Sequence, residues 1–307
     1  MNIMSWVDKK NGCKHHGAVL ESKNGFDIIE CKECKFKHII PIPSNHELKD
    51  LYTHEYYDLE KPLYIEDYTE DQDWHDVVNS ERYNNFENFL NTKHNRILDI
   101  GSGPGLFLKC GLQRGWNVFG IEPSIQAYEH SIKLLGKKNL FNGFFNEETY
   151  QNFGIFDVVN LNLVLEHIPN PRELVTLAKS VLKKGGLINI SVPNDFNPFQ
   201  KILQENLNFS PWWIEPPHHI NYFNHESLSA LLKGQNFEVV YETSSFPIDI
   251  FLLMGDNYIN DNKKGREAHK KRKNFDINIA KSKVSKEIYK AFSNLGLGRE
   301  VITLGRK

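Results

Sequence analysis

The chain has 307 residues, enough for one large domain with an appendage. Its 37 basic residues nearly balance 39 acidic ones, and this net charge of -2 does not favour a nucleic-acid partner. Neither a signal peptide nor the ~18-residue apolar run of a membrane helix is evident. We therefore expect a cytoplasmic protein with no membrane partner, whose four cysteines are thiols or metal ligands.

The first 34 residues combine cysteines and histidines at short spacings. Cys13 and His16 form one knuckle, and Cys31 and Cys34 form a second. The resulting pattern, C-x2-H…C-x2-C, offers four tetrahedral positions for Zn²⁺. Four protein ligands leave no open position for catalysis, so the predicted metal is structural.

His15 and His38 are alternative fourth ligands. Residues 18–30 predict two strands around an Asn24-Gly25 turn, so residues 1–45 are expected to form a small zinc-ribbon-like unit. So short a unit has little core and gains from a metal. A reduced hairpin with incidental Cys and His is the alternative, as is dithiol chemistry in a non-catalytic binding module.

Residues 46–92 are predicted to form a helical and aromatic cap. A weak apolar face indicates a helix from Trp74 to Leu90. The segment before it is rich in acids and tyrosines, which line a substrate pocket or pack on the core: Tyr52, Tyr56, Tyr57, Tyr64 and Tyr68.

The stretch from Arg96 to Gly105 carries the most specific pattern. An apolar run predicts a buried strand, and three glycines at alternate positions then predict a turn whose N–H groups approach a ligand. A second apolar run ends in Glu122, where doubly wound sheets grip ribose hydroxyls. The spacing is D-x-G-x-G-x-G, not the dinucleotide G-x-G-x-x-G. Because Asp99 would repel a pyrophosphate, the loop favours a cationic sulfonium compound.

Apolar runs alternate with helical patterns from residue 93 onward. This order predicts an α/β fold with a doubly wound, mostly parallel sheet, in which residues 193–225 and 245–297 form cap segments. Strands are expected at 96–100, 117–121, 140–141, 156–161, 187–192, 237–240 and 300–304. Helices are expected at 105–114, from Ser124, at 171–183 and at 226–234, with a helix stop at Lys184-Gly185-Gly186.

The chain resembles the class I S-adenosylmethionine-dependent methyltransferases in three places: Asp99–Gly105, Glu122 and Phe156–His167. This resemblance implies a seven-stranded Rossmann-like sheet whose last strand is antiparallel. It also implies that the glycine turn faces the amino acid portion of the cofactor. The cofactor residues it implies are Asp99, Gly101, Ser102, Gly103, Gly105, Glu122, Pro123, Asn142, Asn162 and Leu163.

Methyl transfer to an alcohol needs alignment and a base, and histidine suits that role near neutral pH. His218 and His219 follow the fifth strand in a Pro-Pro-His-His loop, and His167 follows the fourth. These three are the candidate catalytic residues; bracing roles are the alternative, and His225 is taken as an ordinary helix-start residue. Asp195 is a candidate to orient the base.

The predicted reaction is methyl transfer to a small molecule. The resemblance points to a hydroxyl of a sugar, a nucleotide-linked sugar or a related surface-polysaccharide precursor. A basic run at 263–273 is either a solvated helix face or a patch for such an anionic acceptor. A nucleic-acid methyltransferase is the alternative, but Asn160–Leu163 lacks the Asn/Asp-Pro-Pro-Tyr/Phe motif of base-modifying amino enzymes.

Overall fold

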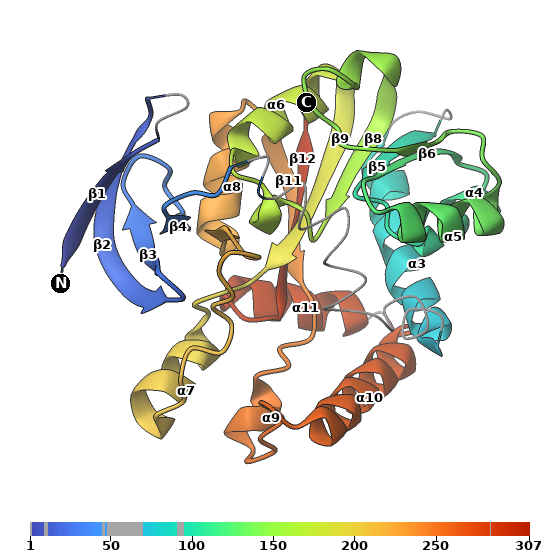
Figure 1. The fold of residues 1–307 in the computed structure, drawn as a ribbon. Coiled ribbons are helices and arrows are strands. Elements are labelled where there is room, and N and C mark those ends of the chain that lie inside the picture. Colours follow the sequence, from blue (N-terminus) through green and yellow to red (C-terminus); the bar gives the residue numbers. More distant parts are fainter. Residues whose placement is uncertain (1, 9–11, 45–46, 48–69, 91–94, 283) are drawn as a thin grey trace.

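The computed structural model describes residues 2–8, 12–44, 47, 70–90, 95–282 and 284–307. The tyrosines predicted to line a pocket at 52–68 therefore lie outside the described residues. Within the described residues the strands form a seven-stranded sheet and a five-stranded sheet. In Figure 1 the larger sheet lies at the centre of the molecule and most of the smaller one beside it.

The larger sheet has the predicted doubly wound topology. Its order is β11-β12-β9-β8-β5-β6-β7, and β12 runs antiparallel to both neighbours while the other pairings are parallel. The strands are β5 (Arg96–Ile100), β6 (Asn117–Glu122), β7 (Leu140–Asn142), β8 (Phe156–Asn162), β9 (Leu182–Pro193), β11 (Glu238–Ser244) and β12 (Glu300–Arg306). The predicted α/β fold with an antiparallel last strand is confirmed.

Helices cover both faces of this sheet. Figure 1 shows α3, α4 and α5 on one side and α6 and α8 on the other. The helices are α3 (Gln72–Phe89), α4 (Leu106–Gln113), α5 (Ile125–Leu135), α6 (Pro171–Ser180), α7 (Pro198–Leu207), α8 (His225–Gly234), α9 (Ile250–Leu253), α10 (Asn262–Ile279) and α11 (Val284–Asn294), with short 3-10 turns η2 (Tyr150–Asn152) and η3 (Leu165–His167). The predicted helix stop at residues 184–186 is wrong, because α6 ends at Ser180 and these residues already belong to β9.

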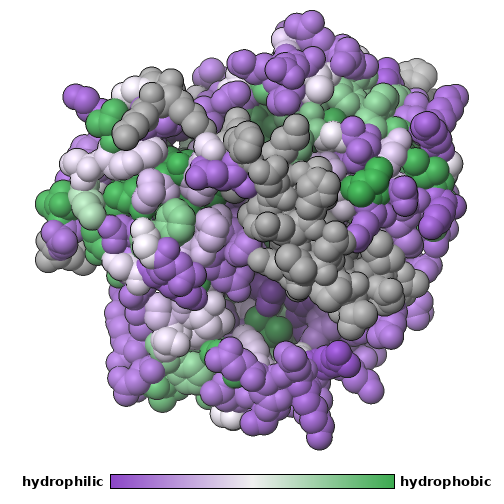
Figure 2. Space-filling view, viewed as in Figure 1, coloured by the Kyte–Doolittle hydropathy of each residue, from purple (hydrophilic) through white to green (hydrophobic). Residues whose placement is uncertain are grey.

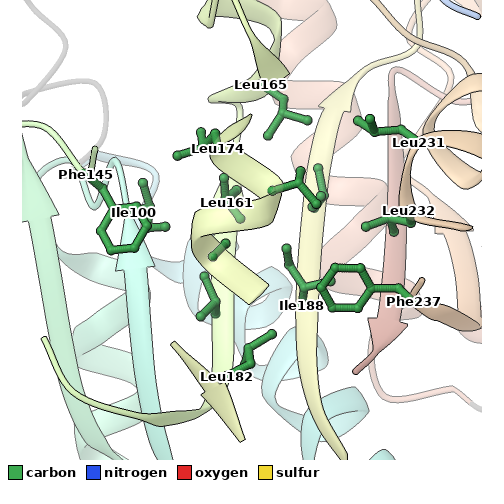
Figure 3. Close-up of a cluster of buried hydrophobic side chains, with 14 of the residues drawn as sticks. Ile100, Phe145, Leu161, Leu165, Leu174, Leu182, Ile188, Leu231, Leu232 and Phe237 are labelled. Atoms are coloured by element: carbon green, nitrogen blue, oxygen red, sulfur yellow. The ribbon is translucent and has the colours of Figure 1, made fainter. Parts of the chain in front are cut away.

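Side chains that alternate along the buried strands contribute to two separate apolar clusters, one on each face of the sheet. Ile97 and Val158 face the cluster that includes side chains of α3 and α4, whereas Leu98 and Val159 face the cluster that includes α6 and α8. Successive side chains of a strand point to opposite faces, so fully apolar strands need a helical layer on each side. Figure 3 shows the second cluster, whose members include Leu161, Leu174 and Leu182.

The smaller sheet joins the N-terminus to the rest of the chain. Its strands, in order, are β1 (Ile3–Val7), β2 (Lys14–Lys23), β3 (Phe26–Cys31), β4 (Lys37–Ile40) and β10 (Asn221–Tyr222). Asn24 and Gly25 both have positive φ (53° and 80°), as a tight hairpin turn requires, so the predicted hairpin is confirmed. The last strand, β10, comes from the predicted cap segment 193–225.

The other predicted cap segment, 245–297, folds into α9, α10 and α11. The basic run lies on α10, an amphipathic helix whose buried side chains include Arg272. Within the described part of the chain, no helix has both the length and the apolar character needed to span a membrane.

Candidate active site and metal site

A cavity of about 610 Å³ opens beyond the carboxyl ends of β5, β6, β8 and β9. Ligands of open parallel sheets bind at this edge, because loops from several strands converge there. Much of the outer surface on the face drawn in Figure 2 is hydrophilic. The lining of the cavity includes many charged and polar side chains.

The glycine turn forms one wall of this cavity. Gly101, Gly103 and Gly105 have positive φ values of 72°, 53° and 93°, a region that residues with a Cβ rarely occupy. A Cβ on Gly101 would also lie 2.7 Å from Val164 Cγ2. Gly101, Ser102 and Gly103 line the cavity, whereas Gly105 is the N-cap residue of α4 and is not among the lining residues.

Glu122 closes the same wall from the end of β6. Its side chain is buried, and its two oxygens accept hydrogen bonds from the backbone N–H groups of Gly103 (2.8 Å) and Ser124 (2.9 Å). Burial raises the pKa of Glu122 to about 7, although these two hydrogen bonds lower it. A carboxylate has further lone pairs, so it can also accept bonds from ligand hydroxyls.

Asp99 lies deeper, at the end of β5. Its Oδ1 accepts a 2.7 Å hydrogen bond from Asn160 Nδ2, and Asn160 Oδ1 accepts another of 2.7 Å from Asn189. Burial raises the pKa of Asp99 to about 8; the hydrogen bond from Asn160 and the charge of Arg82 oppose that rise. Asp99 is among the residues that line the cavity.

Asn162 ends β8 and Leu163 directly follows it, and both line the cavity. Asn162 Oδ1 is buried and has no hydrogen-bond partner among the described residues, so it is placed to accept from a ligand donor. Leu163 adopts a positive φ of 56°, which a branched side chain normally avoids. Such backbone strain is concentrated at binding sites.

Pro123 lines the cavity as predicted, but Asn142 is not among the lining residues. Asn142 is exposed, and its Nδ2 donates to the carbonyl oxygens of Glu122 (2.9 Å) and Pro123 (3.1 Å). It therefore holds the loop after β6, while residues 143–145 line the cavity in its place.

The three candidate histidines differ in whether they line the cavity. His167 and His219 line the cavity with ring centroids 5.1 Å apart, whereas His218 is not among the lining residues. His167 Nδ1 lies 2.8 Å from the carbonyl oxygen of His218, so a proton on Nδ1 is donated there. His167 Nε2 lies 3.7 Å from the carboxylate of the buried Glu166.

His225 begins α8 and is not among the cavity-lining residues; burial lowers its pKa to about 4. Asp195, the candidate to orient a base, does line the cavity. Burial, together with the neighbouring Asp249, raises the pKa of Asp195 to about 8.

Two polar residues at this cavity, Arg82 and Trp213, were not among the predicted site residues. Asp195 Oδ2, Trp213 Nε1 and Arg82 Nε are buried without hydrogen-bond partners in the part of the chain that the structure describes. Arg82 comes from α3, where it shares a helix face with the buried Asn79 and Phe86. A charged residue on an otherwise buried face was the available signal for Arg82.

A second cavity, of about 670 Å³, adjoins the first and shares Arg82, Asn162 and Arg299 with it. Arg272 of α10 lines this second cavity, stacks 4.6 Å from the Trp74 ring and is buried. Its Nε has no hydrogen-bond partner in the described ranges, although Asp276 and Glu300 line the same cavity.

The N-terminal sheet gathers a separate Cys/His cluster. Candidate ligand atoms of His15, Cys31, Cys34 and His38 all lie within 4.8 Å of one another. His15 Nδ1 is 3.1 Å from His38 Nε2, 3.4 Å from Cys34 Sγ and 3.8 Å from Cys31 Sγ. The edges of a tetrahedral Zn²⁺ site with Zn–N and Zn–S bonds of ordinary length measure about 3.3–3.8 Å. The two N–S separations lie in this range, and the N–N separation is slightly shorter.

Cys31 and Cys34 are placed as predicted, but the structure gives Cys13 and His16 other surroundings. Cys13 is exposed, and His16 pairs with Glu33. The reason is that β2 begins at Lys14, earlier than the expected start at residue 18, so neighbours 15 and 16 point to opposite faces. Of these two, His15 is the buried one, and His38 of β4 completes the cluster.

The comparisons with known proteins agree with this geometry. The methyltransferase-domain family matches residues 75–242, which is more than half of the chain. The chain therefore belongs to this family of methyltransferase domains, and the resemblance to class I S-adenosylmethionine-dependent methyltransferases is confirmed.

A ubiquinone biosynthesis O-methyltransferase of Cronobacter sakazakii is 31% identical over 103 residues, which cover 32% of this chain and 42% of that protein. Its namesake from Dechloromonas aromatica is 35% identical over 104 residues, covering 32% and 44%. The chain thus matches less than half the length of these relatives.

Similar solved structures include a SAM-dependent methyltransferase from Archaeoglobus fulgidus, at 18% identity and a TM-score of 0.49, covering 76% of this chain and 94% of that one. The plantazolicin methyltransferase BpumL in complex with SAH has 16% identity and a TM-score of 0.48, covering 85% and 93%.

Proposed function

We propose that this chain transfers the methyl group of S-adenosylmethionine to a hydroxyl of a small, polar acceptor. One observation carries the proposal: a single cavity brings together the glycine turn, the Glu122 carboxylate and the His167–His219 pair. Cofactor binding and proton removal, the two requirements of methyl transfer to an alcohol, are thereby met in one place.

The residues at the glycine turn fit this cofactor. Glu122 offers carboxyl oxygens to ribose hydroxyls, and Asn162 Oδ1 offers an acceptor to an ammonium group. A cation bound beside Asp99 would favour the ionised form of that buried carboxyl. Bound there, S-adenosylmethionine supplies an electrophilic methyl group on a sulfonium that is already a good leaving group. Residues 143–145 lie at the adenine end of this wall.

We assign the general base to His219 and a positioning role to His167. His219 faces the cavity, whereas His167 holds the carbonyl of His218 and so fixes the backbone directly before His219. An imidazole in this position accepts the acceptor's hydroxyl proton as the methyl group is transferred. His218 contributes its carbonyl to this arrangement.

For the acceptor we propose a sugar or nucleotide-linked sugar, a precursor of a surface polysaccharide. Asp195 Oδ2 and Trp213 Nε1 supply an acceptor and a donor to hydroxyl groups. Arg82 and Arg299, with Arg272 in the adjoining cavity, suit an anionic diphosphate. A phenol is the second candidate, because the curated relatives are named for an O-methyltransferase of ubiquinone biosynthesis.

We also propose that His15, Cys31, Cys34 and His38 hold a structural Zn²⁺. The donor set is of the Cys2His2 kind, and the separations between donor atoms are close to those of a tetrahedral site. His38 Nδ1 lies 2.9 Å from the Ile39 carbonyl oxygen, so a proton on Nδ1 leaves the Nε2 lone pair for a metal. The four ligands close the site to catalysis.

An acceptor screen tests the proposed reaction. Purified protein is incubated with methyl-labelled S-adenosylmethionine and separate panels of nucleotide sugars, free sugars, catechols and single-stranded RNA. Label in a nucleotide sugar supports the full proposal, and label in a catechol alone would replace the sugar with a phenol. Label in RNA alone would contradict the small-molecule assignment.

A further inference from the structure

We infer that the metal bound by His15, Cys31, Cys34 and His38 clamps the acceptor loop, residues 212–222. The state of the metal site then governs the half of the cavity that holds the methyl acceptor, and leaves the cofactor half intact. This inference rests on the Zn²⁺ site and on the role of His219 proposed above.

The first link runs through the backbone from a ligand to the loop. His38 lies in β4, and β4 pairs with β10 in the register His38↔Asn221 and Lys37↔Tyr222. The N–H of Ile39 also donates a 2.9 Å hydrogen bond to the carbonyl oxygen of Ile220. A metal that fixes His38 therefore fixes the strand against which the end of the acceptor loop is laid.

The second link runs from β10 to the turn that carries Glu166 and His167. The Ile220 N–H donates a 2.8 Å hydrogen bond to the carbonyl oxygen of Glu166. Asn221 is buried, and its Nδ2 donates hydrogen bonds to the carbonyl oxygens of Leu165 (2.9 Å) and Ile168 (2.7 Å). Strand β10 is thus held between the metal-binding strand and the histidine turn of the cavity.

The hairpin of β2 and β3 holds the other end of the loop. Lys23 Nζ donates a hydrogen bond to the carbonyl oxygen of Ile214, and Asn24 Nδ2 donates one of 3.3 Å to the carbonyl oxygen of Pro216. An apolar cluster joins the two parts and includes Ile28 and Ile39 from the N-terminal sheet and Trp213, Ile214, Ile220 and Tyr222 from the loop. Trp213 and His219, which line the cavity, are therefore carried by a segment secured at both ends.

The metal-binding turn is itself anchored to the methyltransferase body. Arg172 of α6 donates 2.9 Å hydrogen bonds to the carbonyls of Glu33 and Cys34. The apolar cluster around Cys31 is small, with Ile29 and Ile40 as its other buried members. So little buried surface makes the conformation of this turn depend on the metal.

The cofactor half has different supports. The Gly101–Gly105 turn follows β5, and Glu122 is the last residue of β6. These strands are hydrogen-bonded to each other and to β7 and β8 in the parallel sheet. Gly101 and Ser102 donate to the carbonyl of Ile121, inside the same sheet. Loss of the metal is therefore expected to loosen residues 212–222 and leave this turn ordered.

The test compares ligand variants with matched controls in the full chain. Cys34→Ser and His38→Gln remove ligands, whereas Cys13→Ser and His16→Gln change the same residue types outside the cluster. Metal content is measured by mass spectrometry, S-adenosylhomocysteine affinity by calorimetry, and backbone order by hydrogen–deuterium exchange. Wild-type protein stripped with a chelator and then reloaded with Zn²⁺ provides a measurement without any substitution.

We expect one Zn²⁺ per chain in wild type and both controls, and its loss from both ligand variants. Without metal, peptides covering 212–222 should exchange at least about tenfold faster and recover on reloading, while peptides covering 97–110 and the S-adenosylhomocysteine affinity stay within about twofold. Loss of metal with unchanged exchange at 212–222 would overturn the clamp. Loss of S-adenosylhomocysteine binding in step with the metal would overturn its restriction to the acceptor half.

The failures of the separate proposals are distinguishable. Wild-type protein that binds no Zn²⁺ but still binds S-adenosylhomocysteine would refute the metal site, and the clamp with it, without touching the methyltransferase assignment. Metal-loaded protein that binds no S-adenosylhomocysteine would contradict the cofactor proposal and leave the clamp testable by exchange.

Discussion

The backbone N–H of Gly103 donates a 2.8 Å hydrogen bond to Glu122 Oε2, which joins the turn after β5 to the end of β6. The carboxylate thus holds the glycine turn in shape as well as facing the cavity. A single side chain therefore links the two cofactor motifs that are 19 residues apart in the sequence.

Replacing Glu122 with Gln tests this link. An amide lacks the charge that strengthens bonds from ribose hydroxyls and from the Gly103 N–H, so affinity for S-adenosylhomocysteine should fall by about 1.5–3 kcal/mol. Calorimetry measures the change, with the exposed Glu147→Gln as the matched control. Equal affinities of the two variants would remove Glu122 from the cofactor site.

A comparison of Gly101→Ala with Gly115→Ala separates the effect of side-chain crowding on stability from that of backbone strain. Gly101 has φ 72° and its Cβ would meet Val164, whereas Gly115 has φ 84° and no atom within 4 Å of its Cβ. Gly115→Ala should therefore cost only the strain of a positive φ, on the order of 1 kcal/mol. Urea unfolding should show a larger loss for Gly101→Ala than for Gly115→Ala. Equal losses would mean that Val164 moves aside without cost.

Stability should depend on pH through the buried carboxyls of the cavity. The pKa of Asp99 is raised from 3.8 to about 8, so between these values the folded chain keeps a proton that the unfolded chain has released. The free energy of unfolding then falls as pH rises through this window. Urea titrations at several pH values should show this fall, and Asp99→Asn should reduce its slope. An unchanged slope in Asp99→Asn would contradict the raised pKa.

His219 and His218 should differ sharply in kinetics. If His219 removes the acceptor's proton, His219→Ala should lower kcat by about 10²–10⁴. His218→Ala keeps the backbone carbonyl that holds His167, so its kcat should stay within a few-fold. S-adenosylhomocysteine affinity checks that both variants fold. Equal and small losses would leave both residues as structural.

The glycine turn, Glu122 and the doubly wound, mostly parallel sheet were predictable because each depends on local signals. A strand ending in glycines at alternate positions, an acid after the next strand, and helices between strands need no long-range contact to recognise. The structure accordingly places Asp99, Gly103 and Glu122 together at one cavity.

The residues of the Cys/His cluster, which we propose as metal ligands, were only half predictable. The choice between His15 and His16 depends on which of them faces inward from β2. The strand begins four residues earlier than predicted, and His15 is then the one that faces inward. His38 enters through the pairing of β3 with β4, a contact that spacing does not specify. Cys31 and Cys34 follow from a two-residue spacing, which is why they were found.

Other parts of the site depend on tertiary packing. Arg82 reaches the cavity because α3 packs on α4, and Asn142 leaves it because its side chain bonds the carbonyls of its own loop. Neither contact has a sequence signature at the residue itself. The division between His218 and His219 likewise follows from the bond between His167 and the His218 carbonyl.

Paired calorimetric titrations of the wild-type protein with S-adenosylhomocysteine and with NAD most directly test the central claim, that the carboxylate-bearing glycine turn binds a sulfur-containing nucleoside and not a diphosphate. Saturable binding of S-adenosylhomocysteine, with no heat from NAD, is the predicted result. Saturable binding of NAD in the absence of S-adenosylhomocysteine binding would contradict the account.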